Sequence, residues 1–118
     1  MTLNPTNTNL ATVGAGTLLA AALIGGFITR SGPTGGANDT LDSTANIIAA
    51  LGGASVTPWV CEYYNTTAYT LVLVAGDSKT TFTGQSTSIA THTIATLIFT
   101  PSASGAIVCQ VFSRSAAV

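Results

Sequence analysis

Hydrophobic and polar residues alternate along most of the second half of the chain. Trp59, Cys61 and Tyr63 fall on one side of an extended backbone, and the residues between them fall on the other. Such runs are rich in the β-branched and aromatic residues that favour strands. The pattern predicts strands over residues 56–64, 69–74, 80–84, 86–90, 93–100 and 107–113. The first two flank a short turn and are expected to pair as a hairpin.

The stronger of two helical signals covers residues 45–51. Asp42 or Ser43 is the expected N-cap, and Gly52 is the expected stop. Three apolar residues spaced i, i+1 and i+4 should form the face that packs on the sheet: Ile47, Ile48 and Leu51.

A weaker helical signal covers residues 18–23, which are mostly Leu and Ala. Thr17 is its expected cap, and the Gly25-Gly26 pair should end it. The Phe and Ile that follow predict a short strand over residues 27–30.

Residues 1–16 are expected to form an extended N-terminal arm, because Thr, Asn and Pro dominate the start and Gly14 and Gly16 allow flexibility. Residues 17–118 are expected to form one β-rich domain, since 118 residues fit a single core. Together these signals predict a mainly β fold. The expected architecture is an antiparallel β-sandwich or barrel-like domain with one short packed helix.

The chain carries very few charges. Lys and Arg total 3, Asp and Glu total 4, and charged residues make up 6% of the sequence, against about 25% in an ordinary domain. A basic patch is missing, so phosphate-driven binding of nucleic acid is not expected. A chain this neutral, and 47% apolar, is expected to cover much of its surface against another protein.

Residues 10–29 contain no charge and are long enough to span a bilayer as a helix. A single-pass membrane anchor is therefore an alternative interpretation. Against it, the segment contains several Gly and Thr residues and has no aromatic belt or basic flank. Association with a membrane is accordingly not the preferred prediction.

Catalytic and metal-binding patterns are weak. Asp39 and Asp42 are explained by helix capping, which leaves Glu62 and Asp77 as the other carboxylates. His92 has no second imidazole or thiol near it in the sequence. The chain is therefore predicted to be no enzyme and to need no cofactor or metal.

Four aromatic residues could form a binding platform, but alternation divides them between two faces: Trp59, Tyr63, Tyr64 and Tyr69. Those on the exposed face would suit a protein interface. Cys61 and Cys109 match no zinc or redox motif. They are expected to be small buried residues on strands, with a disulfide between neighbouring strands as the alternative.

Several segments, in order, carry a resemblance to a known family. They are residues 23–35 (LIGGFITRSGPTG), 39–42 (DTLD), 45–51 (ANIIAAL), 65–71 (NTTAYTL) and 75–76 (AG). The order resembles the small decoration, or cement, proteins of tailed bacteriophage capsids, in register over residues 18–100. Residues 59–63 are more aromatic than that family's pattern, so the resemblance is least informative there.

The resemblance implies a structural virion protein on the exterior of the capsid, assembled in the host cytoplasm. Its partners would be the major capsid protein and further copies of itself, as a trimer or alternatively a dimer. The arm would reach neighbouring coat subunits, and its deletion should leave the domain folded. The implied contact residues are Thr2, Leu3, Asn4, Pro5, Thr6, Leu10 and Val13. Besides the membrane anchor, a fibre or receptor-binding knob is the alternative with similar β composition.

Overall fold

A computed structural model describes residues 6–52 and 58–115 of the chain. The protein is mainly β, as predicted, with about half of the described residues in strands. The elements, in order, are β1 (Thr6–Leu10), β2 (Gly16–Leu18), α1 (Ala20–Gly25), β3 (Gly26–Arg30), β4 (Ala37–Leu41), α2 (Thr44–Ala50), β5 (Trp59–Asn65), β6 (Leu71–Val74), β7 (Thr80–Gly84), β8 (Ser88–Ile89), β9 (Thr93–Pro101) and β10 (Ile107–Ser115).

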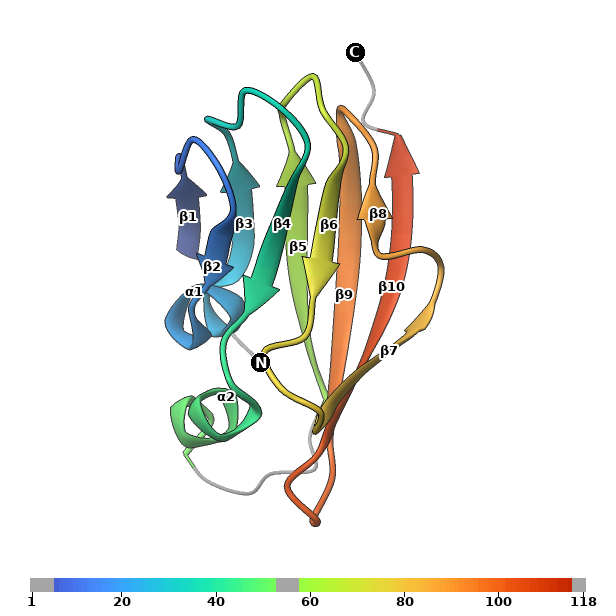
Figure 1. Cartoon of the computed structure of the whole chain (residues 1–118). Helices are drawn as coiled ribbons and strands as arrows, with labels where there is room; N and C mark the ends of the chain where they lie inside the picture. The colour runs from blue at the N-terminus through green and yellow to red at the C-terminus, as the bar shows by residue number, and fades with distance from the viewer. Residues whose placement is uncertain (1–5, 53–57, 116–118) are drawn as a thin grey trace.

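The strands form two mixed sheets that lie in two layers. The larger sheet has the order β1-β3-β5-β9-β10-β7, and the smaller has the order β2-β4-β6-β8. Figure 1 shows the four-stranded sheet in front of the six-stranded sheet, with both helices at one end. The two sheets do not close into a barrel over the described residues.

Five of the eight strand pairings in the described residues are parallel, so the expected antiparallel character holds only in part. The antiparallel pairs are β5–β9, β9–β10 and β6–β8. In the first half, β1 and β3 lie in one sheet while β2 and β4 lie in the other. Each sheet therefore receives every second strand, and neighbours within a sheet run in the same direction.

The predicted hairpin of residues 56–64 and 69–74 is wrong. β5 belongs to the larger sheet and β6 to the smaller one, so the segment between them crosses from one layer to the other. Asn65 stabilises this crossing, because its side-chain amide donates to the carbonyl oxygens of Tyr69 at 2.8 Å and Ile89 at 3.0 Å. The first residues of the predicted strand, 56 and 57, lie outside the described residues.

Alternation correctly placed three residues of β5 on one face, and the structure shows that this face is the buried one. Trp59, Cys61 and Tyr63 are all buried between the layers. The Trp59 ring stacks on Phe99 of β9 with the ring centroids 4.6 Å apart, and its indole N–H donates to the Leu23 carbonyl. The buried apolar residues of the smaller sheet complete this core: Leu18, Leu41, Leu71, Leu73 and Ile89.

Two short helices are present, where the sequence predicted one packed helix. In α2, the Ser43 side chain accepts from the Asn46 amide, which confirms Ser43 as N-cap. α1 begins at Ala20 and has no cap from Thr17, because Thr17 is in β2. The Asp42 carboxylate instead accepts from the Ala20 amide at 2.9 Å. The first turn of α1 is thus capped by a residue distant in the sequence.

The predicted N-terminal arm contributes strands to both sheets within the described residues. Thr6–Leu10 forms β1, which pairs in parallel with β3 at the edge of the larger sheet. Gly16 already belongs to β2 of the smaller sheet. The boundary between an arm and a domain at residue 17 therefore has no counterpart among the described residues, because residues 6–16 connect the two layers (Figure 1).

Candidate functional site

A buried ion pair lies between the layers near the start of the chain. The Arg30 Nε atom of β3 donates to Asp39 Oδ2 of β4 at 2.8 Å, and both side chains are 0% exposed. Tyr63 of β5 donates its hydroxyl to the same carboxylate oxygen, and the Gly16 amide donates to the other at 3.1 Å. Asp39 is therefore a cross-layer acceptor, and its expected role as a helix cap is wrong.

Arg30 uses its remaining N–H groups on main-chain carbonyls. Its guanidinium donates to the carbonyl oxygens of Thr12 at 2.7 Å, Ser31 at 2.8 Å and Leu10 at 3.2 Å, and to that of Gly14. These bonds hold the segment between β1 and β2. Next to it, Gly32 has a φ of 97°, and a Cβ there would overlap the Ala11 carbonyl.

The arrangement is closed and fully paired, which indicates a structural role. Burial raises the pKa of the Tyr63 hydroxyl, and its hydrogen bond to Asp39 raises it further, so this tyrosine stays neutral. No buried side-chain polar atom among the described residues lacks a partner. A group that acts on a substrate would need a free donor or acceptor at an accessible surface.

The carboxylates do not form a catalytic pair. Asp77 accepts from the amide and hydroxyl of Thr44 at the start of α2, at 3.0 and 2.6 Å. These two bonds, the hydroxyl first, lower the pKa of Asp77. Asp42 accepts from the Ala20 amide of α1 and, beside α2, from the Ser43 amide and the Asn46 side chain. The bond from the Asn46 side chain is the main reason that the pKa of Asp42 is lowered. Each carboxylate thus has its own structural partners.

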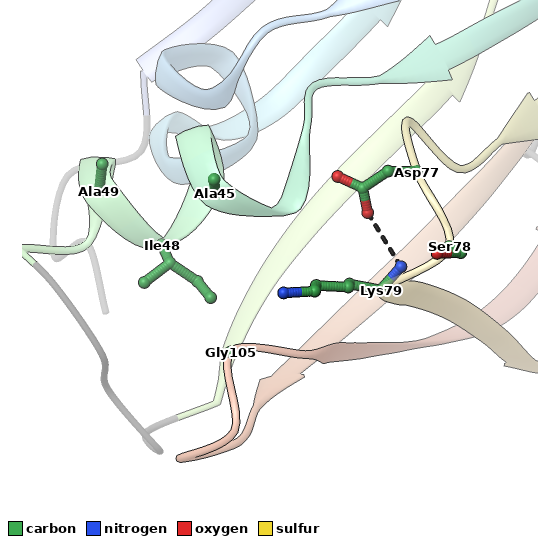
Figure 2. A pocket seen from close by; sticks show the side chains of 7 residues that line it. All are labelled: Ala45, Ile48, Ala49, Asp77, Ser78, Lys79 and Gly105. Atoms are coloured by element: carbon green, nitrogen blue, oxygen red, sulfur yellow. Dashed lines mark hydrogen bonds between the residues drawn. The ribbon is translucent and has the colours of Figure 1, made fainter.

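An open hollow of about 620 Å³ lies between α2 and the loops before β7 and β10. Figure 2 shows the side chains of Ile48 and Lys79 pointing into this space, with Asp77 at its rim bonded to the Lys79 amide. The lining is otherwise small: Ala45, Ala49, Ser78 and Gly105. His92 lies away from it in the turn before β9, exposed and with a φ of 52°. The titratable side chains that line the hollow are therefore Asp77 and Lys79, without His92.

Metal binding finds no support in the geometry. Among residues 6–52 and 58–115, no group of three or more His, Cys, Asp or Glu residues could hold an ion. Cys61 and Cys109 are free and buried, as expected. The alternative disulfide between neighbouring strands is wrong, because β9 lies between β5 and β10. Two strand spacings are about 9.5 Å, which exceeds the reach of a disulfide.

The most accessible apolar surface is the outer face of β5, β9 and β10. We call it the outer face; its members are Val60, Glu62, Tyr64, Ile94, Thr96, Ile98, Val108, Gln110, Phe112 and Arg114. Val60 is 42% exposed, Val108 38% and Phe112 45%. Exposed apolar side chains on β5 and β10, with the half-buried Ile94 and Ile98 of β9 between them, are typical of a surface that another protein covers.

One ion pair crosses the outer face. Arg114 lies 3.4 Å from Glu62 Oε2, and both side chains bond to the Thr96 hydroxyl. In the register, Thr96 has Glu62 on one neighbouring strand and Phe112 on the other. The ion pair therefore has an apolar side chain beside it. The two charges cancel, which leaves a face without net charge. Of the aromatic platform, only Tyr64 lies here; Trp59 and Tyr63 face the core, and Tyr69 lies in a loop.

The implied arm contacts are scattered. Thr2, Leu3, Asn4 and Pro5 lie outside the described residues. Thr6 is exposed on the edge strand, and Leu10 packs against the core. Val13 is 64% exposed, in the segment held by Arg30. Within the described range, only Thr6 and Val13 are therefore available to a partner.

Residues 10–29 are divided among the end of β1, β2, α1 and β3. Within the described parts of the chain, no helix is long and apolar enough to cross a membrane. Comparisons with protein-family models, with curated proteins and with solved structures found no match to this chain. A function must therefore be argued from the surface itself.

Proposed function

We propose that this chain is a structural virion protein that binds the outside of a tailed-phage capsid and stabilises the shell by bridging major capsid protein subunits. The observation that carries the proposal is the outer face, where Val60, Val108 and Phe112 are exposed around a single compensated ion pair. The resemblance over residues 18–100 supports the same class of protein. The two-layer arrangement is consistent with a β-sandwich, the architecture that the strand pattern predicted.

The mechanism is binding without chemistry. Burial of apolar area on a flat sheet face contributes about 25 cal/mol per Å², and the absence of net charge on that face removes any need to match an opposite charge. Attachment should therefore depend little on salt, because screening acts on exposed charges. As a homo-oligomer, a trimer or alternatively a dimer, the protein would present several such faces to adjacent coat subunits.

The experiment fractionates cells infected by a tailed phage that carries the gene for this chain. Lysates are separated into membranes, DNA-filled heads and free tails, and the chain is quantified in each fraction. The proposal expects it on heads, retained after a wash in about 1 M salt, roughly seven times the physiological ionic strength. Recovery on tails would favour the fibre knob, recovery in detergent-extracted membranes would favour the anchor, and either result would overturn the proposal.

A further inference from the structure

The larger sheet ends in an edge strand that nothing covers within the described residues. This strand is β1, with five uncharged residues, Thr6–Leu10. The other edges are less suited to pairing: β2 has three residues, β8 has two, and β7 ends at Gly84 with a φ of 88°. Exposed edges are usually protected by charge, proline or a bulge, and otherwise act as templates for another strand.

The direction of the backbone groups on β1 follows from its hydrogen bonds. The Leu10 carbonyl accepts from the Ser31 amide at 2.9 Å, so Leu10 turns its backbone groups towards β3. Backbone groups alternate along a strand. Thr8 therefore also faces β3, whereas Asn7 and Asn9 turn their amides and carbonyls to the open edge. A strand added there would find up to four main-chain partners.

A second copy of the same strand satisfies these groups reciprocally. In an antiparallel pair with the two-fold axis at Thr8, Asn7 lies opposite Asn9 of the other copy and exchanges both bonds with it. Side chains close to a two-fold axis lie near side chains of the same or a neighbouring position in the other copy, so like charges there would repel each other. Residues 1–29 contain no charged side chain. The edge is thus electrostatically suited to self-association.

Apolar surface beside β1 would be buried by the same contact. A small pocket of about 70 Å³ opens next to the strand, lined by Thr8, Leu10, Leu19 and Ala22 among others. Leu19 itself is 59% exposed. Edge addition commonly combines main-chain bonds with a pocket for a side chain. The second copy would cover Leu19 and the pocket on both sides of the axis.

We propose that the protein forms a two-fold dimer through antiparallel pairing of β1 with β1 of a second copy, which joins the two six-stranded sheets into one. Both outer faces then lie on the same side of the continuous sheet. The inference concerns the purified chain alone, and it holds or fails regardless of whether the chain binds a capsid. It selects the dimer from the oligomeric states considered above.

The test compares two double variants of the full chain by sedimentation equilibrium. In the Asn7→Lys/Asn9→Lys variant, like charges face each other across the axis. The dissociation constant of the dimer should therefore rise at least about tenfold. In the Asn7→Lys/Asn9→Asp variant, each lysine faces an aspartate of the other copy, and the dimer should be retained. Both residues are exposed, and circular dichroism checks that each variant keeps the wild-type strand content.

A crosslinking experiment fixes the register independently. The Thr8→Cys variant places two thiols at a non-hydrogen-bonded position about 4.5 Å apart between Cα atoms, so mild oxidation should link the two copies. The matched Asn7→Cys variant should not crosslink, because Asn7 faces Asn9. A wild-type chain that stays at 11.8 kDa, a dimer indifferent to the two lysines, or crosslinking equal at both positions would each overturn the proposal.

Discussion

Two arginine–carboxylate pairs lie on opposite faces of the six-stranded sheet. The Arg30–Asp39 pair faces the smaller sheet, at 2.8 Å and with both side chains 0% exposed. The Arg114–Glu62 pair lies on the outer face at 3.4 Å, with side chains 58% and 27% exposed. The same chemistry has different consequences, because removing one partner of a buried pair leaves an unsolvated charge, whereas an exposed partner is solvated by water.

The buried pair also organises a chain segment, which the exposed pair does not. Arg30 bonds to carbonyls of residues 10–14, and Asp39 bonds to Tyr63 and Gly16. The buried pair therefore connects β1, β2, β3, β4 and β5 across the two layers. The outer pair bonds only to Thr96 besides itself. The interior of the N-terminal half is thus fixed by polar bonds, and the outer face is free to meet a partner.

The largest expected effect comes from deleting residues 2–16. The deletion removes β1 and the carbonyls of Leu10, Thr12 and Gly14 that satisfy Arg30, so the buried guanidinium loses its acceptors. We expect loss of cooperative unfolding in urea, in contrast to the sequence-based expectation that the domain stays folded. Deletion of residues 2–5 alone is the control and should keep the transition. A sharp wild-type transition in the longer deletion would contradict the role of the segment.

Next comes the Arg30→Met substitution, which leaves Asp39 buried without its cation. Breaking a buried pair in this way costs about 3–5 kcal/mol in the free energy of unfolding. The Arg30→Met/Asp39→Leu double variant should recover part of that loss, because no charge is then left unpaired. Urea denaturation of the three proteins measures both values. A double variant less stable than the single one would count against this account.

A smaller effect concerns the carboxylates at the helix starts, which lie between these two extremes of exposure. The pKa values of Asp42 and Asp77 are lowered from 3.8, mainly by bonds from Asn46 and Thr44 respectively. A lowered pKa in the folded state means that the stabilisation is complete above the ordinary pKa and is lost as the pH falls through the folded value. Stability should therefore decrease below about pH 4.

The Asp42→Asn/Asp77→Asn variant tests this assignment. Its thermal midpoint should fall less steeply between about pH 4 and pH 2 than that of the wild type, since two of the groups that take up protons are gone. Scanning calorimetry at several pH values measures the difference. Parallel pH profiles for the two proteins would show that these contacts do not control the acid sensitivity.

On the outer face, Phe112→Ser should separate stability from binding. The side chain is 45% exposed, so the free energy of unfolding should change by about 0.5 kcal/mol or less. Occupancy on purified heads should nevertheless fall, because the proposed contact loses its largest exposed apolar side chain. Ser88→Thr, an exposed substitution on β8 of the smaller sheet, is the control. Unchanged occupancy would exclude the outer face from the contact.

The smallest effect is expected for Arg114→Gln. Exposed pairs of this kind contribute about 0–1 kcal/mol, and Thr96 can still bond to Glu62. Urea denaturation should place this variant close to the wild type, far from Arg30→Met. A loss as large as that of the buried variant would remove the distinction between the two pairs.

Much of the fold was predictable where local pattern decides. Trp59, Cys61 and Tyr63 were correctly assigned to one face, which is buried, and Ser43 was one of the two expected caps of α2. The same alternation placed Val60 and Tyr64 on the opposite, outer face. Phe112 could have been found by extending the pattern of 107–113 to its outward positions. Side chains alternate with a period of two regardless of which strand lies beside them.

The pairing of strands was not predictable in the same way. β4 was missed because Asn38 and Asp39 disfavour strands, and β5 and β6 were assigned to a hairpin because only a short turn separates them. Any strand can offer main-chain bonds to any other, so the sequence near a strand does not name its neighbour. The parallel arrangement of the first half arises from contacts between residues far apart in the chain.

The sequence by itself determined a mainly β chain, the residues that share a face of a strand, and its shortage of charge. Only the tertiary structure decided where the few charges lie. Arg30 and Asp39 are nine residues apart, and the sequence predicted no contact between them, since Asp39 was expected to cap a helix. They form a buried pair because β3 and β4 belong to different layers, and because carbonyls from residues 10–14 supply the remaining acceptors. An ion is tolerated in a core only when such distant partners satisfy it together, and that condition cannot be read locally.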